Sequence, residues 1–168
     1  ETRRLTTSRL AHAHAGAKLS QAASRLAYPW SAGSIAIKAW ARKAYPGLSD
    51  EAAVAALWDY IFAATRVDQP DPIQAWREHL DQLAAHMDYL NRMSFRRLRY
   101  TAPGTDFTLD LPDGHRWIGG GAGDHNGARF VPNLPTEEVF SAPARDGVNG
   151  VVASTMPLNY NGSLIEGI

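Results

Sequence analysis

Two adjacent carboxylates, Glu137 and Glu138, stand in the segment Phe-Val-Pro-Asn-Leu-Pro-Thr-Glu-Glu-Val-Phe at residues 130–140. Successive side chains of an extended chain point to opposite faces, so one of the two carboxylates is expected to face inward and the other outward. An inward carboxylate needs a cation or several hydrogen-bond donors, because burying it alone is prohibitively costly. Taken alone, the pattern favours two surface glutamates over a binding site.

The histidines are the next residues that could bind a metal, and the sequence holds six of them. His12 and His14 are two residues apart, which places them on different faces of an expected helix. His79 and His86 share a helix face, but two helical turns separate them, which is too far for one ion. We interpret these four side chains as solvated surface histidines.

A local zinc site is a weaker alternative. His115 and the pair Asp124-His125 offer three nitrogen and oxygen ligands, the minimum for a catalytic zinc ion. Their spacing matches no rigid ligand motif, and the neighbouring glycines indicate a flexible loop.

Several other kinds of chemistry are excluded by what the sequence lacks. The glycines of residues 119–123 are followed by no Lys-Ser/Thr pair and no helical pattern, so they do not form a phosphate-binding loop. The sequence contains no Gly-x-Ser-x-Gly element and no cysteine. A nucleophile elbow, a thiolate metal site and a disulfide framework are therefore all excluded for this stretch of chain.

Composition places the 168 residues among ordinary globular proteins, with 45% hydrophobic and 20% charged residues. Lys and Arg number 17 and balance 17 Asp and Glu, which argues against nucleic acid as a partner. No apolar run approaches the roughly 18 residues of a membrane span, and no signal-peptide pattern opens the chain. These features predict a cytoplasmic protein with no membrane partner.

The order of expected elements predicts an α+β fold, helical in the first half and antiparallel β-rich in the second. Helices are expected at residues 5–25 and 34–43, from Ser49 or Asp50 to residue 65, and at residues 71–97. Asp71 can cap the last of these helices, whose apolar stripe runs from Ile73 to Leu90. Residues 25–28 could form a short strand. Further along the chain, we expect a hairpin of residues 106–111 and 115–118, and a second strand pair of residues 148–155 and 163–168.

The segment Pro-Asn-Leu-Pro-Thr-Glu-Glu-Val-Phe-Ser-Ala-Pro at residues 132–143 closely resembles a signature of the thermophilic metalloaminopeptidase family, which includes leucyl aminopeptidase T, aminopeptidase S and PepS. The resemblance covers nearly the whole chain, although only residues 132–162 carry specific text. The other stretches that look like the family are residues 27–29, 71–76, 104–106, 145–150 and 157–162.

The resemblance implies a central fragment of a longer two-domain enzyme. Residues 1–98 would be the mainly helical end of an N-terminal α/β domain, and residues 99–168 the β-rich beginning of a metal-binding catalytic domain. In the family, the glutamate before Val-Phe is a metal ligand, and it corresponds to Glu138; the resemblance gives Glu137 no role. The other ligands, a glutamate, two histidines and an aspartate, are expected beyond Ile168, as are the catalytic residues.

The implied function is a metal-dependent aminopeptidase that hydrolyses N-terminal residues from peptides with water activated by two divalent ions, either zinc, cobalt or magnesium. A homodimer is expected. Because one carboxylate cannot hold a catalytic metal, the 168 residues alone are expected to be inactive. Two alternatives stay open: a degenerate homologue, and a non-catalytic module that binds a peptide or small ligand through Trp117, the Gly-rich loop and His125.

Overall fold

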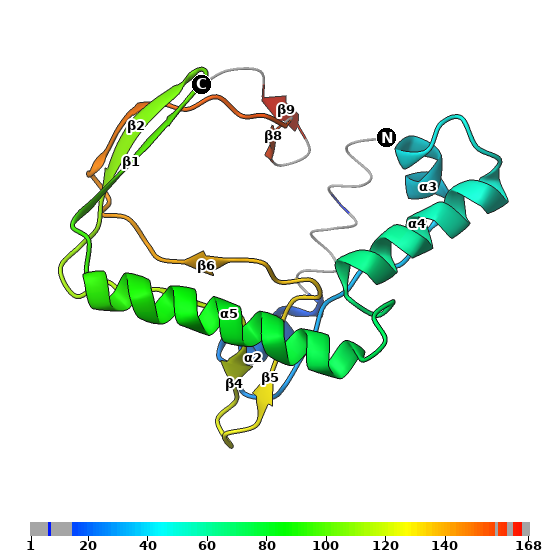
Figure 1. Cartoon of the computed structure of the whole chain (residues 1–168), viewed down its shortest axis with the longest axis horizontal. Helices are drawn as coiled ribbons and strands as arrows, with labels where there is room; N and C mark the ends of the chain where they lie inside the picture. The colour runs from blue at the N-terminus through cyan, green and yellow to red at the C-terminus, as the bar shows by residue number, and fades with distance from the viewer. Residues whose placement is uncertain (1–6, 8–14, 157, 161–162, 166–168) are drawn as a thin grey trace. The chain divides into compact units, whose positions relative to one another are not determined.

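The structure, a computed structural model, describes residue 7 and residues 15–156, 158–160 and 163–165 (Figure 1). These residues cluster into two compact units, which are described separately. Unit 1 takes its described residues from Glu1–Arg25, Arg92–Arg116 and Ser141–Ile168, and unit 2 takes its own from Leu26–Asn91 and Trp117–Phe140. The predicted domain boundary at residues 98 and 99 concerns the longer protein and stays a prediction.

Helices occupy the first half and short antiparallel strands the second, which confirms the predicted α+β class. The helices are α2 (Ala17–Ser24), α3 (Lys38–Ala44), α4 (Asp50–Ala64) and α5 (Pro72–Met93). Much of the helix expected at residues 5–25, including His12 and His14, lies outside the described residues. Residues 25–28 form a turn and a bend, so the short strand expected there was wrong. None of the helices within residues 15–156 is long and apolar enough to cross a membrane.

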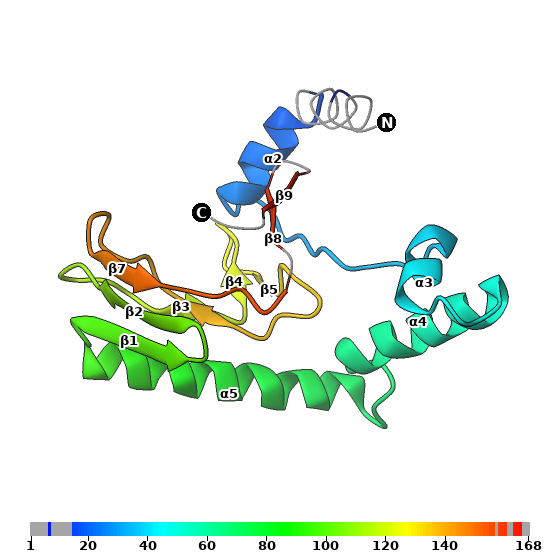
Figure 2. The same cartoon turned by 90° about the horizontal axis from the view of Figure 1, so that it is seen from above.

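Helix α4 begins where its local sequence predicts, since the Ser49 side chain accepts a hydrogen bond from the Ala52 amide at 3.3 Å. Its buried face repeats every fourth residue and packs on α3, which lies beside it in Figures 1 and 2. The buried side chains of this core are Ala41, Ala53, Leu57 and Ile61.

Helix α5 also begins at its predicted cap, where Asp71 accepts a hydrogen bond from the Gln74 amide at 2.9 Å. Its apolar stripe is buried or half-buried from Trp76 to Leu90, whereas Ile73 is 66% exposed. The helix ends at Met93 instead of continuing to residue 97, because Ser94 adopts a left-handed conformation with φ 47°. The arginines that follow therefore begin a strand.

Unit 1 contains a three-stranded antiparallel sheet in the order β1-β2-β7, visible from above in Figure 2. Its strands are β1 (Arg97–Ala102), β2 (Thr105–Asp110) and β7 (Val148–Val151). The predicted strand at residues 106–111 exists as β2, but the predicted return strand at residues 115–118 is not its partner. Instead, a two-residue turn ending at Gly104, whose φ is 74°, joins β2 to β1.

The pairing expected for residues 148–155 with residues 163–168 was also wrong. Strand β7 pairs with β2, and β9 (Ser163–Ile165) pairs with β8 (Leu158–Tyr160). The β1–β2 hairpin is closed by a two-residue turn, which costs little closure entropy, whereas β2 and β7 pair across a long stretch of sequence.

Unit 2 holds two short strand pairs, each of which takes one strand from the Gly-rich stretch or its start. Strand β3 (Ile118–Gly119) pairs with β6 (Val139–Phe140), and β4 (Ala122–Gly123) pairs with β5 (Arg129–Phe130). Gly119 lies so close to β6 that an added Cβ atom would stand 2.4 Å from the Glu138 carbonyl oxygen. Only a residue without a side chain permits this backbone approach.

Truncation of the core between α3 and α4 tests this packing. Leu57 is 2% exposed, so Leu57→Ala should lower the free energy of unfolding by about 2–5 kcal/mol through lost burial and a residual cavity. Leu48→Ala is the matched control, since Leu48 is 50% exposed and its loss should change stability by less than about 0.5 kcal/mol. Urea unfolding of the full-length variants measures both values, and equal effects would contradict this core.

The close approach at Gly119 makes a second prediction. Gly119→Ala should cost about 1–3 kcal/mol of stability, because its methyl group displaces the β6 backbone at Glu138. Gly123→Ala, in the same loop, is the control: no atom lies within 4 Å of its added Cβ. Thermal and urea unfolding compare the stabilities of the two variants. A Gly119→Ala protein as stable as Gly123→Ala would contradict the close packing of Gly119 against β6.

Candidate metal-ligating site

The segment that carries the two glutamates is tied down at its start by backbone hydrogen bonds. The Ala32 amide donates to the Pro132 carbonyl at 2.7 Å, and the Leu134 amide donates to the Ala32 carbonyl at 2.8 Å. These bonds form a parallel bridge between Ala32 and Asn133. These hydrogen bonds fix the backbone position of the segment just before the two glutamates.

Glu137 is held by a two-pronged ion pair with Arg66. The guanidinium Nη1 and Nη2 atoms donate to the Oε1 and Oε2 atoms of Glu137 at 2.7 and 3.1 Å. This fork fixes the orientation of both groups, unlike a single point contact. The hydrogen bonds from Arg66 hold the pKa of the Glu137 carboxyl below its usual range, so the carboxylate stays charged at neutral pH.

Arg66 projects from the end of α4, where the backbone turns left-handed with φ 60°. The Val67 amide donates to the Phe62 carbonyl at 2.9 Å and the Arg66 amide donates to the Ala63 carbonyl at 3.1 Å. This pair of bonds is a Schellman motif, whose left-handed position is usually glycine. The guanidinium carbon then lies 5.3 Å from the ring centre of Trp76, within cation–π range.

Trp76 and His79 of α5 complete the surroundings of Arg66. The Trp76 indole N–H donates to the Thr65 carbonyl at 2.8 Å. The rings of Trp76 and His79 are T-shaped to each other, with their centroids 5.7 Å apart. His79 is 11% exposed, so the interpretation of this residue as a solvated surface histidine was wrong. His86, by contrast, is exposed.

Both ring nitrogens of His79 have partners, which fix the orientation of the ring. Its Nε2 atom lies 2.7 Å from the Thr136 carbonyl oxygen, which only accepts hydrogen bonds. Its Nδ1 atom lies 3.1 Å from Nη2 of Arg66, which only donates. The Nε2 atom also lies 3.4 Å from Oε2 of Glu137, so His79 contacts both Arg66 and Glu137.

Glu138 follows directly, and its side chain is exposed. Within the part of the chain that the structure describes, its carboxylate makes no hydrogen bond and no ion pair. Both glutamates are exposed, which confirms the two surface glutamates that the pattern alone favoured over an inward-facing carboxylate. The two carboxylates differ in their partners: the oxygens of Glu137 accept hydrogen bonds from Arg66, whereas no described residue binds those of Glu138.

No complete metal site accompanies Glu138 among the described residues, where no three His, Cys, Asp or Glu side chains could share an ion. The alternative zinc site would combine His115 of unit 1 with Asp124 and His125 of unit 2, and it stays a prediction. The Asp124 Oδ1 atom accepts hydrogen bonds from the Asn126 and Ala128 amides at 2.9 and 2.7 Å, which closes its own turn.

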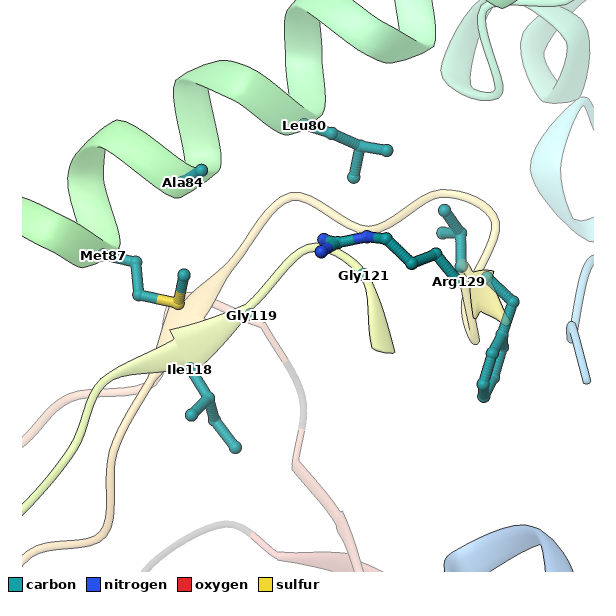
Figure 3. A pocket seen from close by; sticks show the side chains of 9 residues that line it. Leu80, Ala84, Met87, Ile118, Gly119, Gly121 and Arg129 are labelled. Carbon is teal, nitrogen blue, oxygen red and sulfur yellow. The ribbon is translucent and has the colours of Figure 1, made fainter. Parts of the chain in front are cut away.

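A pocket of about 310 Å³ lies beside the strand pair of β3 and β6 (Figure 3). Side chains of α5 form one wall, and Figure 3 shows the guanidinium of Arg129 reaching toward Gly121. Trp117 and His125 do not line this pocket, so it does not match the binding module expected from them. Its lining residues are Leu80, Ala84, Met87, Ile118, Gly119, Gly121, Arg129, Phe130 and Val131.

Several known aminopeptidases are similar in sequence to this chain. Aminopeptidase 2 of Geobacillus stearothermophilus is 55% identical over 138 residues, which are 82% of this chain and 33% of that protein. Aminopeptidase PepS of Streptococcus thermophilus is 51% identical over 140 residues, 83% of this chain and 34% of that protein. Aminopeptidase T of Thermus thermophilus is 48% identical over 139 residues, which are 83% of this chain and 34% of that protein. The chain thus spans about a third of the length of these relatives.

A solved structure described as wild-type AmpT from Thermus thermophilus has the same fold. It aligns with a TM-score of 0.87 at 39% identity, covering 98% of this chain and 40% of that chain. The family described as thermophilic metalloprotease (M29) matches residues 1–168 in full. The chain therefore belongs to the thermophilic metalloprotease family M29, as the resemblance at residues 132–143 predicted.

Proposed function

We propose that the full-length protein is a metal-dependent aminopeptidase and that Glu138 supplies one of its metal ligands. The observation that supports this proposal most is the difference between the two neighbouring glutamates. Glu137 is engaged by Arg66, whereas the Glu138 carboxylate is exposed and, within the described residues, unpaired. Both lie in a chain whose family is named for metalloproteases.

The carboxylate of Glu138 suits zinc, cobalt or magnesium, since a hard oxygen donor binds each of these divalent ions. We propose two ions, with the further ligands and the catalytic residues supplied by parts of the protein outside these 168 residues. When bound, such ions lower the pKa of a coordinated water and polarise the carbonyl group of the scissile bond. Glu138 would add negative charge and one fixed oxygen donor to that site.

The proposed substrates are peptides with a free N-terminus, from which one residue is removed at a time. The names of the relatives support this, since each is called an aminopeptidase. This chain covers about a third of each relative and contributes one proposed ligand. We therefore propose that the 168 residues alone are inactive and that activity belongs to the longer protein.

We further propose a cytoplasmic homodimer. The sequence contains no cysteine, which is compatible with a reducing compartment in which disulfides do not contribute to stability. Light scattering of the full-length protein would give its oligomeric state directly.

Replacement of the proposed ligand tests the function. Glu138→Gln should lower aminopeptidase activity on an aminoacyl-nitroanilide more than about 100-fold, because loss of a direct ligand should exceed the 10–100-fold effects of outer groups. Glu51→Gln is the matched control: it removes an exposed glutamate in the first turn of α4, and activity should stay unchanged. Initial rates with and without added cobalt or zinc measure the effect.

Full metal-stimulated activity in Glu138→Gln would reject the ligand assignment. A wild-type full-length protein that binds zinc but hydrolyses no aminoacyl-nitroanilide would instead favour the degenerate homologue. A protein that binds peptides without metal or hydrolysis would favour the non-catalytic module.

A further inference from the structure

We infer that Arg66, His79 and Glu137 form a clamp that positions Glu138 for metal binding. This inference rests on the proposed function, because it assigns a role through Glu138. None of the three residues would touch the metal; each would act by fixing the chain on which Glu138 is carried. The clamp brings together the end of α4, the first turns of α5 and the segment before β6.

The first step is that the backbone is held on both sides of Glu138, by the clamp on one side and by a strand pair on the other. On one side, His79 binds the Thr136 carbonyl and Arg66 binds the Glu137 side chain. On the other side, Val139 pairs with Gly119 across the β3–β6 ladder. Glu138 is thus the unengaged side chain between two anchored neighbours, and the conformational freedom of its backbone is already restricted before any cation binds.

The second step concerns charge. Two adjacent carboxylates would both attract a divalent cation, and either could become its ligand. The Arg66 fork neutralises Glu137 and occupies both of its oxygens, at 2.7 and 3.1 Å. Of the two neighbours, Glu138 alone then has oxygens that no described residue engages, so the fork selects which of them serves the metal.

The third step is the unusual position of Arg66. A non-glycine residue at φ 60° is strained, and such conformations gather at functional sites. Glycine would end α4 at lower cost, but it has no side chain to reach Glu137. The arginine here is explained by its side-chain contacts and not by the helix end.

Zinc affinity of the full-length protein tests the clamp, measured by competition with a chromophoric chelator on metal-free protein. Glu137→Gln and Arg66→Gly should each raise the zinc dissociation constant about 10–100-fold, the usual effect of groups that orient a ligand. Arg66→Gly suits the left-handed backbone, so it removes the fork without adding strain to the helix end.

Asp106→Asn is the matched control. It breaks a fork of similar geometry, in which Arg99 donates to Asp106 at 3.0 and 2.9 Å, but this fork belongs to unit 1, whereas Glu138 belongs to unit 2. Its zinc dissociation constant should equal that of the wild type. Urea unfolding of the metal-free proteins accompanies each measurement, and the clamp variants should weaken zinc binding while remaining folded.

A double-mutant cycle separates positioning from direct binding. Glu138→Ala should weaken zinc binding most, and adding Glu137→Gln to it should cause no further loss, because the clamp acts through Glu138. Independent losses in the double variant would mean that Glu137 binds zinc itself, which would overturn the clamp. Wild-type affinity in Glu137→Gln, with affinity lost in Glu138→Ala, would also overturn it but leave the proposed function standing. Unchanged affinity in Glu138→Ala would reject the proposed function and the clamp with it.

Discussion

The ion pair between Arg66 and Glu137 is the interaction on which the candidate site depends, since it joins residues 71 positions apart in the sequence. Its partners are 23% and 54% exposed, and pairs of this kind contribute only about 0–1 kcal/mol to stability. Its importance is therefore geometric. A bidentate fork fixes both the distance and the orientation of Glu137, which a stronger but undirected apolar contact would not do.

The surroundings of Arg66 explain how a strained residue is retained. The left-handed conformation costs about 1–3 kcal/mol, which the ion pair alone does not offset. Stacking on Trp76 contributes roughly another 0.5–1 kcal/mol, and the contact with His79 adds a hydrogen bond of about the same size. The network as a whole is comparable to the strain, so the left-handed arginine is supported by three partners together and by none of them alone.

Local patterns predicted the helices better than the strand pairs. The caps at Ser49 and Asp71 act within three residues, so the starts of α4 and α5 were visible in the sequence. Strand partners depend on which distant segment closes first, and alternation identified β2 without identifying β1 or β7 as its neighbours. The role of Glu137 was invisible for the same reason, because its partner Arg66 carries no local signal. Glu138 was singled out by family resemblance and not by any pattern of spacing.

The ion pair between Arg66 and Glu137 explains how two adjacent glutamates can serve different purposes. Alternation along an extended segment turns neighbouring side chains to opposite faces, so an anchor on one face leaves the next residue free on the other. A carboxylate anchored through charge also avoids competing with its neighbour, because Arg66 reduces the net charge of the pair from two negative charges to one. An apolar anchor at position 137 would hold the chain through packing without fixing a direction. A charged anchor with a dedicated partner both fixes that direction and leaves a single negative charge where a cation would bind.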